Sequence, residues 1–319
     1  MYNGYRGRFA PSPSGEMHLG NAWTAMLAWL QVRVLGGKMI LRMEDLDPDR
    51  SKGMHANQII EDLRWLGLDW DEGPDIGGPY APYVQDKRRH LYETALQQFE
   101  RAGLLYPCYC SRAELRSVAR APHVGDTYVY PGVCRRLTPD RLREMAGCQA
   151  SLRLAVPTMT VEFTDLCRGV YRQELARDVG DFIIRRADGV HAYQLAVVVD
   201  DAAMKITHVL RGADLLDSTP RQLLLFKLLG LNIPHYSHVS LLVGEDGQRL
   251  SKRHGDISIA ALRRQGAKAE KIVGYLAYKA NLIESWISVK PQELVRDFEL
   301  AKLSLNNVIV HTSELIKMV

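Results

Sequence analysis

Two short motifs contain residue types that could act on a phosphate chain. The first, residues 11–21, places prolines and glycines between an expected strand and an expected helix, with His18 near the helix start. Prolines stiffen a turn, glycines let the backbone approach a ligand, and the amides at a helix N-terminus attract anions. The segment could therefore bind phosphate with His18 as an added donor. The alternative is an ordinary strand–turn–helix connection with a surface histidine.

The second motif is a basic loop bracketed by glycines, residues 246–255, in which Ser251 precedes Lys252. A flexible lysine beside a hydroxyl can follow negative charge onto a leaving phosphate. Taken alone, the loop could equally be a solvated basic hairpin.

Three of the five cysteines form a Cys-x-Cys…Tyr-x-x-x-Cys pattern made by Cys108, Cys110, Tyr130 and Cys134. Three thiolates and a fourth donor could close a tetrahedral zinc site. His123 competes with Tyr130 as the fourth ligand, because its spacing is also compatible. Without a metal, the alternative is a set of partly buried free cysteines.

The elements that would position these motifs alternate between strand and helix over the first 105 residues. Strands are expected at residues 8–11 and 38–43, and helices at residues 20–35, 56–66 and 87–102. This alternation indicates a parallel α/β sheet that binds ligands at the carboxyl ends of its strands.

The alternation then stops and resumes. Residues 106–190 contain cysteines, prolines and short β-rich runs at 151–156, 160–163 and 181–185, which is typical of an insertion. Residues 191–256 return to the α/β pattern, with a strand expected at 206–210 and a helix at 219–229. Residues 257–319 are expected to form a small helical domain, with amphipathic runs at 257–264 and 271–280.

The composition excludes several classes of protein. The chain has 319 residues, of which 46% are hydrophobic and 24% charged, so we expect a globular protein of two or three domains. No run of about 18 apolar residues predicts a membrane helix, and the first residues lack a secretory pattern. Five cysteines, an odd number, favour a reducing compartment, the cytoplasm. The net charge of +4 is compatible with an enzyme that touches RNA and with many others.

Considered together, the motifs resemble one enzyme family. Residues 18–21, His-Leu-Gly-Asn, resemble the HIGH signature of class I aminoacyl-tRNA synthetases, and residues 249–253, Arg-Leu-Ser-Lys-Arg, resemble their KMSKS signature. Further blocks resemble the glutamate-specific branch of that family, at residues 8–15, 41–47, 193–201 and 211–214. The resemblance implies an ATP-dependent ligase that acts on glutamate and RNA.

The resemblance also implies an architecture. It is a Rossmann-type parallel sheet with an inserted zinc-containing α+β subdomain and a small C-terminal helical domain that contacts the RNA stem. The expected segments are 1–105 and 191–256 for the two halves of the catalytic domain, 106–190 for the insertion, and 257–319 for the helical domain.

Site roles follow from the same resemblance. ATP binding is expected from His18, Gly20, Asn21, Ser251 and Lys252. Glutamate binding is expected from Arg8, Ser12, Glu44, Tyr193 and Arg211. His18 and Lys252 would stabilise phosphate charge while the α-carboxylate of glutamate attacks the α-phosphate of ATP. Mg²⁺ is expected to arrive with ATP, and one structural zinc ion to bind the cysteine pattern.

Two departures point to truncated paralogues of the glutamyl-tRNA synthetases. The chain ends at Val319 without the usual anticodon-binding region, and Val197 stands where full-length enzymes usually carry asparagine. The cysteine pattern also recurs as a zinc site in these paralogues. They activate glutamate without tRNA and esterify it to the cyclopentenediol of queuosine, at the wobble position of tRNA(Asp).

The expected partners are therefore ATP, L-glutamate and the anticodon stem-loop of tRNA(Asp), bound by a monomer away from membranes. Two alternatives remain. The first is a short glutamyl-tRNA synthetase that charges the 3′ end of tRNA(Glu). The second is a catalytically silent synthetase-like module that binds RNA.

Overall fold

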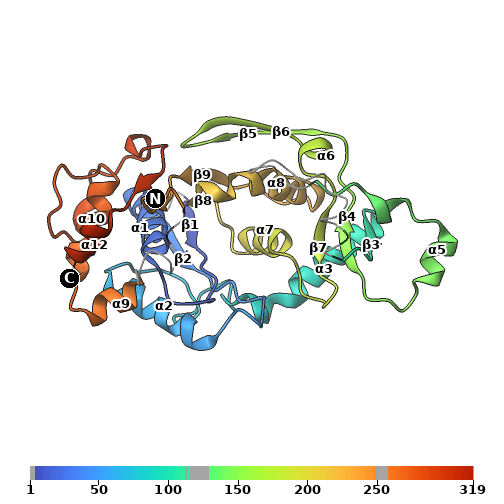
Figure 1. Ribbon diagram of the computed structural model, residues 1–319, viewed down its shortest axis with the longest axis horizontal. Coiled ribbons are helices and arrows are strands. Elements are labelled where there is room, and N and C mark those ends of the chain that lie inside the picture. Colours follow the sequence, from blue (N-terminus) through green and yellow to red (C-terminus); the bar gives the residue numbers. More distant parts are fainter. Residues whose placement is uncertain (1–3, 112–113, 115–128, 249, 251–257, 319) are drawn as a thin grey trace.

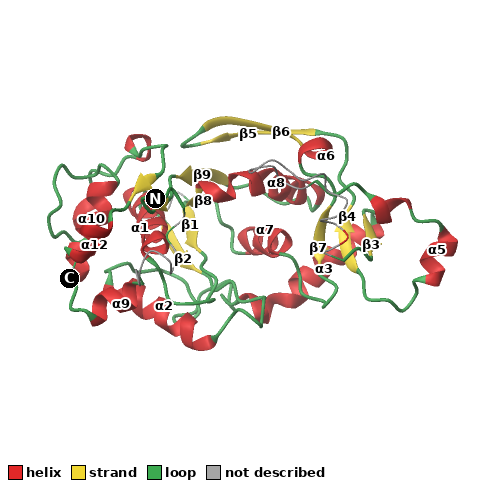
Figure 2. Ribbon diagram, in the orientation of Figure 1, coloured by secondary structure: helices red, strands yellow, loops and turns green. Residues whose placement is uncertain are grey.

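The structure is a computed structural model. It describes the whole chain except residues 1–3, 112–113, 115–128, 249, 251–257 and 319 (Figure 1). The molecule is elongated in this view, with the C-terminal helices at one end and the small antiparallel sheet at the other (Figures 1 and 2).

The central layer is a six-stranded sheet with the order β2-β1-β8-β9-β5-β6. Its strands are β1 (Arg6–Phe9), β2 (Lys38–Leu41), β5 (Thr160–Asp165), β6 (Gly169–Glu174), β8 (His208–Gly212) and β9 (His235–Val239). Every neighbouring pair is parallel except the β5–β6 hairpin. The predicted parallel α/β sheet is confirmed. In addition, β5 and β6 join this sheet from within residues 106–190, which the sequence did not indicate.

Strand β1 lies between β2, which follows it in sequence, and β8, which comes much later, so the strand order reverses direction at β1. Such a switch point opens a crevice beyond the carboxyl ends of the two strands. The fold therefore brings the residues that follow β1, β2 and β8 to one place.

Helix α1 (Leu19–Val34) packs against β1 and β8. Its sequence is apolar around nearly the whole circumference, which suits a helix buried on all sides. Gly7 on β1 is required by this packing, because a Cβ at that position would collide with Val32 of the helix.

Further helices surround the sheet: α2 (Gly53–Trp65), the 3-10 helix η1 (Gln85–Arg88), α3 (Arg89–Arg101), α7 (Tyr193–Ala203), the 3-10 helix η3 (Ala213–Ser218) and α8 (Thr219–Leu228). Helix α7 packs against both α3 and α8. The interior of this half is an apolar cluster that includes Leu96, Leu195 and Phe226.

The other elements described within residues 106–190 are a small antiparallel sheet with the order β3-β4-β7 and the short helices next to it in sequence. The elements are β3 (Leu105–Cys108), the 3-10 helix η2 (Val133–Arg136), α5 (Pro139–Glu144), β4 (Ser151–Leu154), α6 (Leu175–Asp178) and β7 (Phe182–Arg185). The predicted runs at 151–156 and 181–185 are therefore strands of this sheet.

The described residues of the C-terminal segment form short helices joined by loops, together with a short strand. Its elements are α9 (Ile259–Arg264), α10 (Ala269–Lys279), α11 (Pro291–Leu294), the 3-10 helix η5 (Leu300–Lys302), β11 (Val308–Ile309) and α12 (Thr312–Ile316). Strand β11 pairs in parallel with β10 (Leu242–Val243). Helix α11 contacts both α1 and α10, and the buried side chains of all three helices belong to one apolar cluster. No helix of the described chain is long and apolar enough to cross a membrane.

Candidate active site

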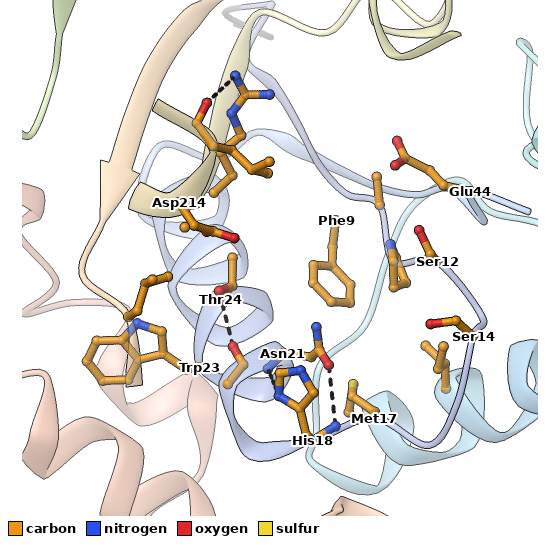
Figure 3. A pocket seen from close by; sticks show the side chains of 18 of the residues that line it. Phe9, Ser12, Ser14, Met17, His18, Asn21, Trp23, Thr24, Glu44 and Asp214 are labelled. Atoms are coloured by element: carbon orange, nitrogen blue, oxygen red, sulfur yellow. Dashed lines mark hydrogen bonds between the residues drawn. The ribbon is translucent and has the colours of Figure 1, made fainter. Parts of the chain in front are cut away.

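A cavity of about 820 Å³ lies at the carboxyl ends of β1 and β8. This volume suits a ligand of nucleotide size. Figure 3 shows Ser12 and Glu44 on one side of it, Asp214 on the other, and His18 with Asn21 at the start of α1. Its lining includes eight of the residues predicted from sequence: Arg8, Ser12, His18, Gly20, Asn21, Glu44, Tyr193 and Arg211.

The predicted phosphate-loop residues Ser251 and Lys252 lie outside the described residues. Leu250, which precedes them, lines the cavity.

His18 is the N-cap of α1. Its Nδ1 accepts the backbone N–H of Asn21 over 3.2 Å, and the Asn21 side chain accepts the N–H of His18 over 3.4 Å. The backbone N–H of Asn21, one of the amides at the start of α1 that could bind phosphate, is therefore already bonded to His18. Because Nδ1 is an acceptor, the neutral ring carries its proton on Nε2, so Nε2 is a hydrogen-bond donor.

Behind the cavity, Arg42 and Glu44, which follow β2, form a buried ion network with Asp201 of α7. Arg42 donates to Asp201 Oδ1 over 2.7 Å and to Glu44 Oε1 over 3.0 Å. The same Asp201 oxygen receives Arg8 Nε over 3.3 Å. Two cavity residues, Arg8 and Glu44, are thus both held by the Arg42–Asp201 pair.

The charges in this network balance. Burial raises the pKa of Asp201, but Arg8 and Arg42 outweigh it and hold that pKa below its usual range. Burial also raises the pKa of Glu44, and there the opposing effect of Arg42 is too small to reverse it. Next to this network, the carboxylate of Asp200 accepts hydrogen bonds from the side chains of Gln85, Arg88 and Tyr92.

Arg211 also lines the cavity. It donates through Nε to His238 Nε2 over 3.0 Å and through Nη2 to Thr219 Oγ1 over 2.8 Å. Its third nitrogen, Nη1, is buried and has no partner among the described residues. Unlike Arg8, it forms no ion pair with a carboxylate in the described part of the chain. A guanidinium that lines a cavity in this way can bind an anion.

Sequence reasoning did not single out Asp201 and His238 as separate contributors. Asp201 stood inside the recognised block 193–201, but its partners lie far away in the sequence. His238 lies on a strand that no pattern had indicated. No local signal connects either residue with the cavity.

Val197 was noted because full-length relatives usually carry asparagine there. The structure places it on α7 with 1% of its surface exposed, inside the apolar cluster under that helix. Its side chain is therefore surrounded by apolar neighbours.

The cysteine pattern forms a compact cluster at the far end of the molecule. The Sγ atoms of Cys108, Cys110 and Cys134 all lie within 4.8 Å of one another. The Tyr130 hydroxyl is 3.5 Å from Cys108 Sγ and 3.7 Å from Cys110 Sγ. In a tetrahedral zinc–sulfur site neighbouring donors are about 3.8 Å apart, so these four side chains fit one metal ion.

The groups of the cluster differ in acidity: burial raises the pKa of Cys110 to about 12 and also raises the pKa of Tyr130, whereas the pKa of Cys108 is lowered. Burial opposes ionisation of Cys108, but hydrogen bonds with Tyr130 and Arg153 outweigh it and lower the pKa of this thiol to about 7. A lower pKa favours the thiolate, which is the form that binds metals. The alternative ligand His123 lies outside the described residues. Cys148 and Cys167 are not part of the cluster.

Comparison with known proteins agrees with this geometry. Residues 5–317 match the family model of the class I tRNA synthetases for glutamate and glutamine, catalytic domain. The chain therefore belongs to this family, as its motifs predicted.

Among its relatives, the glutamyl-Q tRNA(Asp) synthetase of Symbiobacterium thermophilum is 55% identical over 93% of both chains. That of Nitratidesulfovibrio vulgaris is 53% identical over 91% of this chain and 90% of its own. Glutamate–tRNA ligase 2 of Nitrosococcus oceani is 45% identical over 93% of this chain but only 63% of its own length. The relatives are class I ligases, which confirms the expected class of enzyme.

A solved structure supports the fold. The crystal structure of a glutamate tRNA ligase from Elizabethkingia meningosepticum, in complex with its amino acid, superimposes with a TM-score of 0.85 at 28% identity. The match covers 99% of this chain and 69% of the other.

Proposed function

We propose that this protein activates L-glutamate with ATP in the absence of tRNA and transfers it to the cyclopentenediol of queuosine at the wobble position of tRNA(Asp). The observation that carries this proposal is the identity of 55% and 53% to two glutamyl-Q tRNA(Asp) synthetases over at least nine-tenths of each chain. The full-length glutamate–tRNA ligases are less similar and extend well beyond the matched region.

In this proposal the cavity binds glutamate by charge. The substrate has two carboxylates and one ammonium group, so it needs guanidinium donors and an anion. Arg211 with Tyr193 receives the side-chain carboxylate, and Arg8, Ser12 and Glu44 hold the amino-acid end. The position of Arg211 in the lining of the cavity, without an ion pair to a carboxylate in the described part of the chain, supports this assignment.

ATP would bind across the start of α1, at His18, Gly20 and Asn21, with Ser251 and Lys252 closing from the second motif. The glutamate α-carboxylate attacks the α-phosphate, so that glutamyl-adenylate forms and pyrophosphate leaves. The chain mainly positions the reactants and stabilises phosphate charge. The Nε2–H of His18 and the ammonium of Lys252 would supply that stabilisation, and Mg²⁺ would arrive with the nucleotide.

One zinc ion would be held by Cys108, Cys110, Tyr130 and Cys134. Its role would be to fix the loop of the insertion, at a distance from the reacting groups. The proposed division into segments 1–105, 106–190, 191–256 and 257–319 keeps this metal in the insertion and the RNA-stem contacts in the last segment. A cytoplasmic monomer remains our expectation.

The deciding experiment compares charging of two purified RNAs with labelled glutamate. We expect label on queuosine-containing tRNA(Asp), lost when queuosine is absent, and no label on tRNA(Glu). Label on tRNA(Glu) instead would establish a short glutamyl-tRNA synthetase. Absence of label on both, together with no glutamate-dependent pyrophosphate exchange, would leave the silent RNA-binding module.

A further inference from the structure

A buried carboxylate–imidazole pair stands directly behind Arg211. His238 Nδ1 lies 2.6 Å from Asp165 Oδ2, and neither side chain is exposed to solvent. The other ring nitrogen, Nε2, accepts Arg211 Nε over 3.0 Å. Three strands are thereby joined by side chains in a line: β5 through Asp165, β9 through His238 and β8 through Arg211.

Asp165 is held firmly in this line. Its Oδ1 accepts the backbone N–H groups of Cys167, Arg168 and His238 at 3.0, 3.0 and 3.2 Å. A carboxylate with this many donors stays ionised and cannot rotate. Asp165 also belongs to the hairpin that the 106–190 segment adds to the central sheet.

The chemistry of the line allows one arrangement of protons. Arg211 Nε always carries a hydrogen, so His238 Nε2 must be the acceptor. The imidazole proton then sits on Nδ1 and is donated to Asp165. Asp165 therefore selects the tautomer of His238 that can receive Arg211.

The orientation of the Arg211 guanidinium follows. Nε is fixed by His238 and Nη2 by Thr219, while the Tyr236 ring lies 5.0 Å from the guanidinium carbon. Only Nη1 is left without a partner among the described residues, and it is buried. Two of the three guanidinium nitrogens are therefore fixed by neighbouring side chains, and Arg211 lines the cavity in this orientation.

We propose that Asp165 and His238 are positioning residues for substrate recognition. They hold the guanidinium of Arg211, which lines the cavity, in the orientation in which it meets the side-chain carboxylate of the amino acid. The inference rests on the proposed function, because it assumes that this carboxylate binds at Arg211. It also means that the hairpin contributed by residues 106–190 takes part in amino-acid selection.

The test uses two isosteric substitutions of His238 that separate its two nitrogens. His238→Gln places an oxygen near the Nε2 position and keeps an acceptor for Arg211. His238→Asn places its amide near the Nδ1 position, so it keeps a donor to Asp165 but loses the acceptor. Kinetics of glutamate-dependent ATP–pyrophosphate exchange, without tRNA, give separate KM values for glutamate and ATP.

We expect His238→Asn to raise the glutamate KM by roughly tenfold or more, because it removes a hydrogen bond to a charged group. The ATP KM should stay within about twofold, because the side-chain partners of His238 are Arg211, Thr219 and Asp165, none of which is expected to bind ATP. His238→Gln should largely restore the glutamate KM. Asp165→Asn, whose amide can stabilise the wrong tautomer, should behave like His238→Asn and serves if that variant fails to fold.

A control variant removes a different side-chain hydrogen bond of the β5–β6 hairpin. Tyr171 on β6 donates to Asp217 over 2.6 Å, away from the line of three residues. Tyr171→Phe should leave the glutamate KM unchanged. Equal glutamate KM values in His238→Asn and His238→Gln, whether normal or raised, would overturn the positioning proposal alone. Failure of the native protein to exchange with glutamate would instead overturn the proposed function.

Discussion

The guanidinium of Arg42 lies 2.7 Å from Asp201 Oδ1, and the two side chains are only 0% and 3% exposed. The pair is the centre of the buried network behind the cavity, since Arg42 also binds Glu44 and Asp201 also binds Arg8. A buried pair of this kind is costly to break, because removal of one partner leaves the other charge without compensation.

Asp201→Asn should therefore affect both stability and substrate binding. We expect the free energy of unfolding, measured with urea, to fall by about 3–5 kcal/mol. The glutamate KM should rise, because Arg8 loses its carboxylate partner and Arg42, which binds Glu44, loses one of its own.

The matched control for this prediction is Asp86→Asn. It breaks an exposed ion pair with Arg89 of similar length, 2.8 Å. Exposed pairs contribute about 0.2–1 kcal/mol, so this variant should remain nearly as stable as the native protein. Similar losses in the two variants would show that burial of the network contributes nothing.

His18 has two separable roles, as the cap of α1 and as a proposed phosphate donor. Asparagine is also a good N-cap, so His18→Asn should retain the thermal midpoint while it slows pyrophosphate exchange by roughly a hundredfold. His18→Ala should lower both the thermal midpoint and the exchange rate, with a loss of about 1 kcal/mol in the free energy of unfolding. Native exchange rates in His18→Asn would limit His18 to capping.

The cysteine cluster should be a metal site in solution. Cys134→Ser should lower the zinc content from about one ion per chain to nearly none, and also lower the thermal midpoint. Elemental analysis of the purified protein measures the first effect. Cys148→Ser, which alters an exposed cysteine outside the cluster, should change neither. Native protein that contains no zinc would contradict the site.

Stability should decrease in mild acid because of His208. Its ring stacks on Tyr5 at 3.8 Å, and burial, with a smaller effect of His235, lowers the pKa of His208 to about 4. In the unfolded chain the pKa is about 6.5. Between these values the unfolded state binds a proton that the folded state does not, so the contribution of His208 is complete above pH 6.5 and is lost as the pH falls toward 4.

Urea unfolding at two pH values, above and within this range, tests the contribution of His208. His208→Gln should lose less stability on acidification than the native protein, while a variant of the exposed His90 to glutamine should lose the same amount as native. Identical acid sensitivity in all three proteins would exclude His208 as the source.

Much of the catalytic half was predictable from local sequence. Strands β1 and β2, and helix α1 between them, appear within two or three residues of their expected positions, because hydrophobic periodicity and turn-forming glycines act over short distances. The described residues that the motifs predicted to bind ATP or glutamate also line one cavity. A parallel sheet gathers residues that follow its strands at one edge, so motif positions alone implied this meeting.

What the sequence could not determine was the support behind those residues. Arg42 and Asp201 are 159 positions apart, and His238 and Asp165 are 73 apart, so no periodic pattern links them. The β5–β6 hairpin also joins the central sheet, although its neighbours in sequence belong to another sheet. Residue types and turns are local properties, whereas burial and ion pairing depend on which distant segments pack together. The tertiary structure alone decided how Arg8, Glu44 and Arg211 are held.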